Sequence, residues 1–233
     1  MAELVRWPEA AKVDRLIPKE RLYAETSAST ALRQRFVDEV IRVRWAYKLS
    51  EESMRLAPGE IVTEIQVFEI DLKDSNLDNS VLASIDKATP SQVIFELSRR
   101  EGVGTERAMA AAYKRSGGKT KGTDYFRTDW VASDQPRILL PVALDMDRLY
   151  CQLLGHLFPY PMRAGEELSD ALGRMSRIRS LGREIAALEN RGRSEVQFNR
   201  KIELQHQLRV KEKELDQFTR NESSMSEDAI WRS

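Results

Sequence analysis

The sequence is poor in the residues that build disulfides and zinc sites. It has a single cysteine, Cys151, and only two histidines, His156 and His206. One cysteine excludes an internal disulfide, and two histidines far apart in the sequence without a second thiol argue against a structural zinc ion. A reducing environment fits this composition, and we expect no cofactor and no metal ion.

Net charge and long apolar runs are also missing. The 37 basic residues are matched by 37 acidic residues, so the whole molecule creates no field that attracts nucleic acid or a membrane surface. No segment approaches the roughly 20 apolar residues that a membrane-spanning helix needs. Glu3, Arg6 and Glu9 interrupt the apolar run that a signal peptide requires. We therefore expect a soluble cytoplasmic protein, in which any weak nucleic-acid contact comes from a local patch.

Charged residues are abundant and unevenly placed. They make up 32% of the 233 residues, and their excess lies mainly after Arg163. Hydrophobic residues make up 41%, which is enough for a core. This length suits one domain with an appendage. We predict an α+β body over residues 1–162, a charged helical hairpin over 163–220, and a frayed tail over 221–233.

The first half of the body predicts a helix followed by a long strand. Residues 1–28 are expected to be irregular, with one short helix from Glu9 to Leu16. A helix is expected over residues 30–48, because apolar residues recur there at spacings of three and four: Leu32, Phe36, Val40, Val43 and Tyr47. The β-branched run 61–73 predicts a strand. Its alternation changes phase near Val67, which indicates either a bulge or burial of both faces.

The second half of the body predicts two helices and three strands. One helix begins at Asp78 or Asn79 and another at Asp145, because these side chains can cap a helix N-terminus. The strands are expected over residues 92–98, 107–115 and 124–131. Adjacent strands without strict βαβα alternation favour an α+β fold with a mainly antiparallel sheet flanked by helices.

The residues after Glu166 predict a helical hairpin or coiled coil. Apolar residues return there every three or four positions, as they do on one face of a helix. Ser194 followed three residues later by Gln197 matches a capping box, which would start a second helix. Two antiparallel helices joined near Gly192 explain this pattern better than one continuous rod.

The apolar stripe of this hairpin is a candidate docking surface. A two-helix unit of this length buries little of its own surface, so its stripe gains from a partner helix or from docking onto the body. An aromatic residue between two amides provides an anchor and fixes the register. We predict partner binding by Gln197, Phe198, Asn199, Ile202 and Leu208.

An acidic strand offers an alternative function, a Mg²⁺-dependent nuclease of restriction-enzyme type. Glu69, Asp71 and Lys73 alternate and so face one side of a strand, as in many nucleases that hold a metal ion and polarise its water. Glu64 or Asp86 could add a carboxylate. The same residues also fit the solvated side of a half-buried sheet, so we assign no catalytic residue and expect a protein without enzymatic activity.

A second alternative is a stand-alone nucleic-acid-binding protein. Basic residues outnumber acidic ones between Arg99 and Arg127, and aromatic residues lie among them. Lysines on a hairpin can reach phosphates, and neighbouring rings can stack on bases. A solubilising hairpin with core aromatics explains the same pattern. The candidate contacts are Arg115, Lys119, Lys121 and Arg127.

Three parts of the chain resemble a known bacterial family. They are WAYKLS at 45–50 with EIQVFEI at 64–70, IDKATP at 85–90 leading into VIF at 93–95, and QFNRKIEL at 197–204. Together they are similar to the domain of unknown function family 4391 over nearly the whole chain. The resemblance carries no catalytic residues. It implies an accessory protein encoded beside DNA methyltransferases and helicases in restriction-like, anti-phage gene clusters, and so favours a non-catalytic scaffold subunit that docks to such partners.

Overall fold

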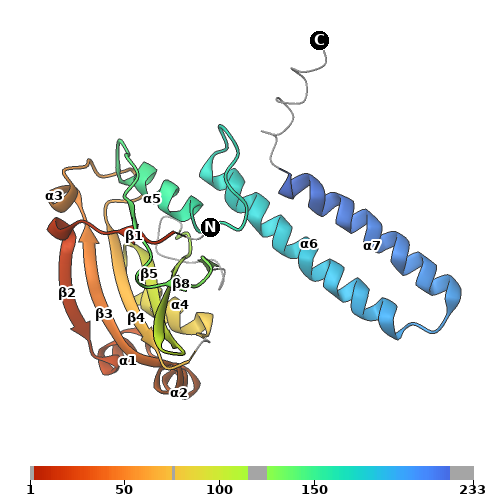
Figure 1. Ribbon diagram of the computed structural model, residues 1–233, viewed down its shortest axis with the longest axis horizontal. Coiled ribbons are helices and arrows are strands. Elements are labelled where there is room, and N and C mark those ends of the chain that lie inside the picture. The colour runs from red at the N-terminus through yellow and green to blue at the C-terminus, as the bar shows by residue number, and fades with distance from the viewer. Residues whose placement is uncertain (1–2, 75–76, 115–124, 221–233) are drawn as a thin grey trace, which may run out of the picture. The chain divides into compact units, whose positions relative to one another are not determined.

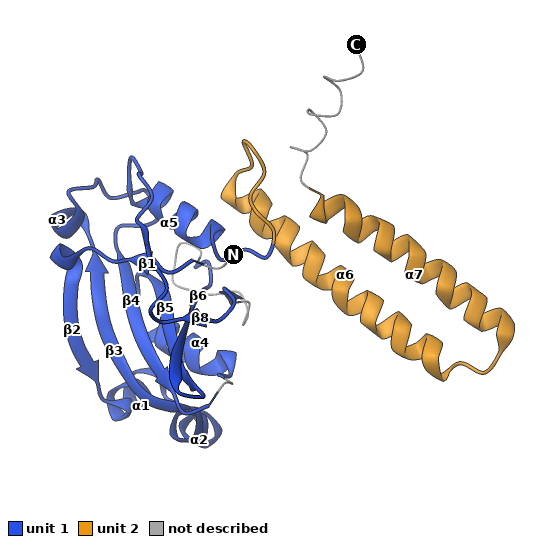
Figure 2. Cartoon of the chain, viewed as in Figure 1, with its two compact units in different colours: residues 1–159 blue, residues 160–233 orange. Residues whose placement is uncertain are grey.

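The computed structural model describes residues 3–74, 77–114 and 125–220. The chain forms two compact units, Met1–Pro159 and Tyr160–Ser233, which Figure 2 shows in different colours. We call the first unit the body and the second the hairpin unit.

A mixed sheet runs through the body in the order β2-β3-β4-β5-β6-β7, with β8 paired to β6 (Figure 1). Neighbouring strands are antiparallel, except that β4 and β5 are parallel and are joined by helix α4. This confirms the predicted α+β fold with a mainly antiparallel sheet. The strands are β2 (Lys12–Ile17), β3 (Val40–Leu49), β4 (Ile65–Leu72), β5 (Gln92–Glu101), β6 (Gly104–Ala111), β7 (Phe126–Arg127) and β8 (Val131–Ala132).

A second, two-stranded sheet lies at the start of the body. It pairs β1 (Val5–Arg6) in parallel with β9 (Ile138–Leu139). The pairing ties the beginning of the chain to a segment more than a hundred residues later, so both belong to one folded unit. The remaining helices of the body are η1 (Glu9–Ala11), α1 (Lys19–Thr26), α2 (Thr30–Glu39), α3 (Glu51–Met54), α4 (Asn79–Ala88) and α5 (Met146–Gly155).

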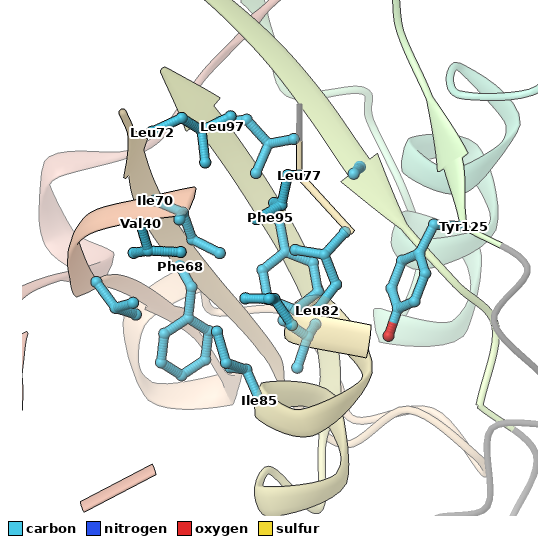
Figure 3. Close-up of a cluster of buried hydrophobic side chains, with 14 of the residues drawn as sticks. Val40, Phe68, Ile70, Leu72, Leu77, Leu82, Ile85, Phe95, Leu97 and Tyr125 are labelled. Carbon is cyan, nitrogen blue, oxygen red and sulfur yellow. The ribbon is translucent and has the colours of Figure 1, made fainter. Parts of the chain in front are cut away.

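Helices α1, α2 and α4 cover one face of the large sheet and enclose the main core. Phe36 from α2 and Ile85 from α4 are fully buried against Ile70 of β4 and Phe95 of β5. Figure 3 shows this cluster, with Tyr125 closing one side. Alternate residues of a strand face opposite ways, so the residues between these core positions point to the other face of the sheet.

The predicted helix over residues 30–48 is wrong in its second half. A helix ends at Glu39, and strand β3 begins at Val40. Two register shifts interrupt the pairing of β3 with β4, and they leave every third residue buried: Val40, Val43, Ala46 and Leu49. The two irregularities thus give the buried residues of this strand a spacing that resembles the spacing of apolar residues on one face of a helix. Its β-branched and aromatic residues favour the strand.

The expectation for residues 1–28 also needs correction. The segment from Glu9 to Leu16 forms a single 3-10 turn followed by strand β2, and helix α1 follows directly. The predicted helix 9–16 is therefore wrong beyond its first turn. Strand β2 is only partly buried, so its sequence lacks a clear apolar alternation.

Most other elements of the body agree with the sequence. Asp78 accepts a hydrogen bond from Ser80 N at the start of α4, and Asp145 accepts one from Arg148 N at the start of α5. Strand β4 is buried on both faces, and the irregularity near Val67 lies in the neighbouring strand β3, between Trp45 and Tyr47. The strand expected over 107–115 ends at Ala111.

The hairpin unit contains two long helices that pack together, α6 (Leu168–Ser194) and α7 (Phe198–Thr219) (Figure 2). The predicted capping box at Ser194 is wrong, because Ser194 is the last residue of α6 and its hydroxyl donates to the carbonyls of Asn190 and Arg191. The break comes after it, where the Glu195 carboxylate accepts from Val196 N and Gln197 N. In the parts of the chain that the structure describes, no helix has the length and apolarity to cross a membrane.

Candidate functional site

The predicted partner-binding residues lie at the start of α7, beside the turn of the hairpin. Phe198 is 76% exposed and Ile202 is 50% exposed, and Val196 in the turn is 94% exposed. Gln197 and Asn199, on either side of the phenylalanine, are exposed as well. The structure thus leaves all of these side chains exposed, and Phe198 and Ile202 lie about one helical turn apart on the same side of α7. We call these exposed residues the tip.

Leu208, the fifth predicted residue, lies elsewhere. It is half-buried and lines a groove of about 350 Å³ between α6 and α7. Leu188, Leu204 and Gly192 line the same groove, and charged residues including Lys201 surround it. Leu208 therefore belongs to the seam between the helices, where it serves the packing of the hairpin itself.

Ion pairs hold the two helices together. Arg177 Nε donates to Glu214 Oε1 at 3.0 Å, and Lys211 Nζ lies 2.7 Å from Glu184 Oε2. The guanidinium of Arg174 is buried, donates to both oxygens of Glu166, and also reaches the Phe218 carbonyl near the end of α7. These contacts close the hairpin without the tip residues. Phe198 and Ile202 are therefore exposed apolar side chains that these contacts between α6 and α7 do not use.

The acids of the nuclease alternative lie on the face of the sheet opposite the main core, together with a third acid, Glu96. Glu69 of β4 is paired in register with Glu96 of β5. The Asp71 carboxylate accepts hydrogen bonds from Arg42 and from the Ser98 hydroxyl. We call this surface, formed by Arg44, Glu69, Asp71, Glu96 and Arg107, the charged face.

Arginines neutralise the charged face. Arg107 donates to Glu96 at 2.6 Å, Arg137 donates to both Glu96 oxygens, and the indole nitrogen of Trp7 adds a hydrogen bond of 3.0 Å. Only 1% of the Glu96 side chain is exposed. Arg44 and Arg107 lie 3.9 and 4.0 Å from the two oxygens of Glu69. Each acid thus already has a cationic partner.

Two neighbouring carboxylates on this face differ in their acidity. Burial opposes ionisation of Glu96, but the hydrogen bonds from Arg137 and the charges of Arg137 and Arg107 outweigh it and lower the pKa of Glu96. Burial, with the nearby Glu96 carboxylate, raises the pKa of Glu69. The face therefore has one strongly ionised acid and one acid that gains a proton more easily.

Lys73, the third residue of the nuclease alternative, lies just beyond the end of β4 and is exposed. Its backbone nitrogen donates to the Glu39 carbonyl. Within the described ranges, no cluster of three or more histidine, cysteine, aspartate or glutamate side chains is placed to hold a metal ion.

Three of the four predicted nucleic-acid contacts, Arg115, Lys119 and Lys121, lie outside the described residues. Arg127 belongs to β7, and its guanidinium donates to the Leu77 carbonyl at 3.0 Å and to the side chain of Asn79. Burial lowers the pKa of Arg127. In this position the side chain joins β7 to the start of α4.

The sequence did not reveal a buried ion pair between Asp86 of α4 and Lys114. Lys114 Nζ lies 2.8 Å from Asp86 Oδ1, and the two side chains are 2% and 1% exposed. The Tyr125 hydroxyl donates to the other Asp86 oxygen at 3.0 Å. Lys114 lies in the basic stretch of the sequence, where nothing separates a buried lysine from solvated ones.

Taken together, the body is an α+β domain with a neutralised charged face, and the hairpin unit presents an unpaired apolar tip. Residues 5–215 match the family model described as Domain of unknown function (DUF4391), and the chain belongs to this family. No curated protein and no solved structure matches the chain.

Proposed function

We propose that the chain is a non-catalytic accessory or scaffold subunit, which docks through its hairpin tip to a DNA-acting partner such as a methyltransferase or a helicase. The observation that carries this proposal is the exposure of Phe198 and Ile202 on a hairpin that is already closed by its own contacts.

The energetics of the tip favour a partner. Fully burying a side chain such as phenylalanine or isoleucine contributes about 1.5–3 kcal/mol. Binding hot spots are typically aromatic anchors surrounded by groups that exclude water. In the proposed complex Phe198 is the aromatic anchor. The exposed amides of Gln197 and Asn199 on either side of it would form hydrogen bonds at the edge of the interface.

The choice of a DNA-acting partner comes from the family resemblance. This resemblance implies a gene neighbourhood with DNA methyltransferases and helicases in restriction-like, anti-phage clusters, and the exposed apolar tip supports a docking role in that context. The charged face is consistent with a structural body, because its acids are bound to arginines.

Co-expression with a DNA methyltransferase and with a helicase, the partner classes that the resemblance implies, tests the proposal. The wild-type chain should co-elute with one of them from a size-exclusion column, and the double variant Phe198→Asp/Ile202→Asp should elute alone. Gln207→Asp is a matched control, since this exposed residue lies on α7 about two and a half helical turns from Phe198 and so on the opposite side. Co-elution of the double variant at the wild-type level would refute docking through the tip.

The nuclease alternative uses Glu69, Asp71 and Lys73, and the structure pairs Glu69 in register with a further acid, Glu96. A divalent ion there would have to displace arginine side chains from these carboxylates, which costs their charge-assisted hydrogen bonds. Mg²⁺-dependent cleavage of DNA by the purified chain, lost in Glu69→Ala, would establish the nuclease in place of the scaffold. Absence of cleavage with every divalent metal tried would remove this alternative.

A further inference from the structure

A cavity of about 250 Å³ lies in the body, and none of its lining residues belongs to the charged face. It is bounded by β2, α1, the start of β4 and the loop after α4. An aromatic ring, two arginines and a cluster of an acid, an amide and a hydroxyl line it. These lining residues include Arg15, Arg21, Trp45, Glu64, Gln66 and Ser91.

Irregularities in two neighbouring strands bring Arg15 and Trp45 to this cavity. An extra residue precedes Arg15 in β2, where Asp14 has a φ of 53°, a rare conformation for a residue other than glycine. The pairing of β3 with β4 shifts directly after Trp45. As a result Arg15 lies opposite Trp45, and Trp45 lies opposite Phe68, on the face that holds the cavity. Bulges that re-aim side chains are common beside binding sites.

Hydrogen bonds fix the inner groups of the cavity in place. Trp45 Nε1 donates to Gln66 Oε1 at 2.6 Å, and Gln66 Nε2 donates to Glu64 Oε1 at 2.8 Å. The Ser91 hydroxyl also donates to Glu64, and Lys48 Nζ lies 2.8 Å from its other oxygen. The indole ring and the carboxylate are therefore held before any ligand arrives, which reduces the entropy lost on binding.

Glu64 offers an ionised acceptor. Burial opposes its ionisation, but the hydrogen bonds from Lys48, Ser91 and Gln66 outweigh this and lower the pKa of Glu64. A carboxylate has about four acceptor positions, so these donors leave capacity for one more. A donor on the ligand, such as an amino group, fits this position.

Of the two arginines that line the cavity, Arg21 is neutralised by Glu25, which also lines it, and Arg15 supplies the positive charge. Arg21 donates to Glu25 across one turn of α1 at 2.9 Å, and both side chains are exposed. Arg15 is exposed, and no ion pair to it is found within the residues that the structure describes. A guanidinium in this state is a good partner for phosphate, which it can bind through two parallel hydrogen bonds.

We propose that this cavity binds a nucleotide whose base carries an exocyclic amino group, with the base stacked on Trp45, its amino group donating to Glu64, and its phosphate bound by Arg15. Stacking on an aromatic ring accepts any base, and the carboxylate then selects among them. Adenine, cytosine and guanine supply the amino donor. Uracil and thymine have no exocyclic amino group. Their N–H lies between two carbonyl oxygens, and a carboxylate repels these oxygens.

The ligand has two possible sources, a free mononucleotide or an unpaired nucleotide of a single strand. Isothermal titration calorimetry of the full chain with CMP and with the oligonucleotide d(C)6 distinguishes them. Equal affinities assign the site to the free nucleotide, and an affinity for d(C)6 that is at least about tenfold higher assigns it to a single strand. Absence of binding by both would overturn the proposal.

Base selection and the phosphate contact are tested in the same way. CMP, AMP and GMP should bind about tenfold more tightly than UMP, the size of one good hydrogen bond. Inorganic phosphate should bind more weakly than any of the three. Equal affinities for UMP and CMP, or for phosphate and CMP, would contradict the assigned roles.

Two variants separate the contributions of the site. Arg15→Ala should lower the affinity for CMP about tenfold without changing that for cytidine. Arg6→Ala, an exposed arginine of β1, is the matched control and should have no effect. Glu64→Gln should abolish the preference for CMP over UMP, because an amide can donate as well as accept. Wild-type behaviour of both Arg15→Ala and Glu64→Gln would exclude this cavity as the site.

Discussion

At the scale of single residues, Asp86 and Lys114 form an ion pair in which both charges are buried. Lys114 Nζ also donates to the carbonyls of Thr89 and Ser91 at 2.7 and 2.6 Å. Burial raises the pKa of Asp86 and lowers the pKa of Lys114, so it disfavours the charged form of both partners. The pair is held by mutual attraction and by its hydrogen bonds.

Removal of one partner should therefore be costly. Asp86→Ala leaves the Lys114 ammonium buried and unpaired, and we expect the free energy of unfolding to fall by about 3–5 kcal/mol in urea titrations. The double variant Asp86→Ala/Lys114→Met should recover part of this loss, because no buried charge remains. Glu9→Ala, which breaks the exposed pair with Lys12, is the control and should change stability by less than about 1 kcal/mol. A loss as small for Asp86→Ala as for the control would contradict a buried pair.

Glu96 should make the body sensitive to acid. Its pKa is lower in the folded chain than in the unfolded chain, so its contribution to stability is complete above the unfolded value of about 4.3 and is lost as the pH falls through the folded value. We expect Glu96→Gln to be less stable than wild type at pH 7 and to lose less stability between pH 5 and about pH 3. Unfolding measured at several pH values checks this, and equal pH dependence of both proteins would disprove it.

At the scale of elements, strand β3 shows where sequence patterns mislead. Its buried residues recur every third position because two register shifts interrupt its pairing with β4, and this imitates a helix. The helices α4 and α5 were predicted because their caps, Asp78 and Asp145, are local signals. Register shifts depend on the neighbouring strand, so the sequence of one segment cannot reveal them.

The candidate site residues show the same difference between local and long-range signals. Phe198 is a predicted docking residue because it stands between two amides, which is a local signal, and its side chain is 76% exposed. Its binding to a partner stays a prediction. The Asp86–Lys114 pair and the Arg137–Glu96 contact join residues 28 and 41 positions apart. Such pairings depend on which strands are neighbours in the sheet, and the apolar periodicity of a sequence does not reveal this order.

Replacement of glycine by alanine should change the stability of the chain in opposite directions at two positions. Gly182 lies within α6, where an added Cβ would meet nothing within 4 Å, so Gly182→Ala should raise stability by about 0.5–1 kcal/mol. A Cβ on Gly59 would overlap the Asp147 carboxylate, which accepts hydrogen bonds from the backbone nitrogens of Glu60 and Val62. We expect Gly59→Ala to lower stability by about 1–3 kcal/mol. Urea unfolding followed by circular dichroism measures both, and changes of the same sign would contradict this assignment.

At the scale of the whole molecule, the chain combines a body whose charged face pairs acids with arginines and a hairpin unit that exposes Phe198 and Ile202. The body has its own core and its own cavity, and the hairpin has its own ion pairs. Each unit therefore supplies a separate function in our account. We propose that the hairpin docks to a protein and that the body binds a nucleotide.

This separation predicts independent losses. Phe198→Asp/Ile202→Asp should lose the protein partner and keep the affinity for CMP, whereas Arg15→Ala should lose affinity for CMP and keep the partner. Calorimetry and size-exclusion chromatography on the same two preparations test this. Loss of both activities in either variant would show that the two sites depend on each other.

The dissociation constant between the purified chain and a DNA methyltransferase or helicase, the partner classes that the family resemblance implies, tests the central claim most directly. We expect Phe198→Ala to raise this constant by a factor of about 30 or more, the effect of removing a hot spot worth about 2 kcal/mol, and Gln207→Ala to leave it unchanged. An unchanged constant for Phe198→Ala, or no measurable binding of the wild-type chain to either protein, would contradict the account.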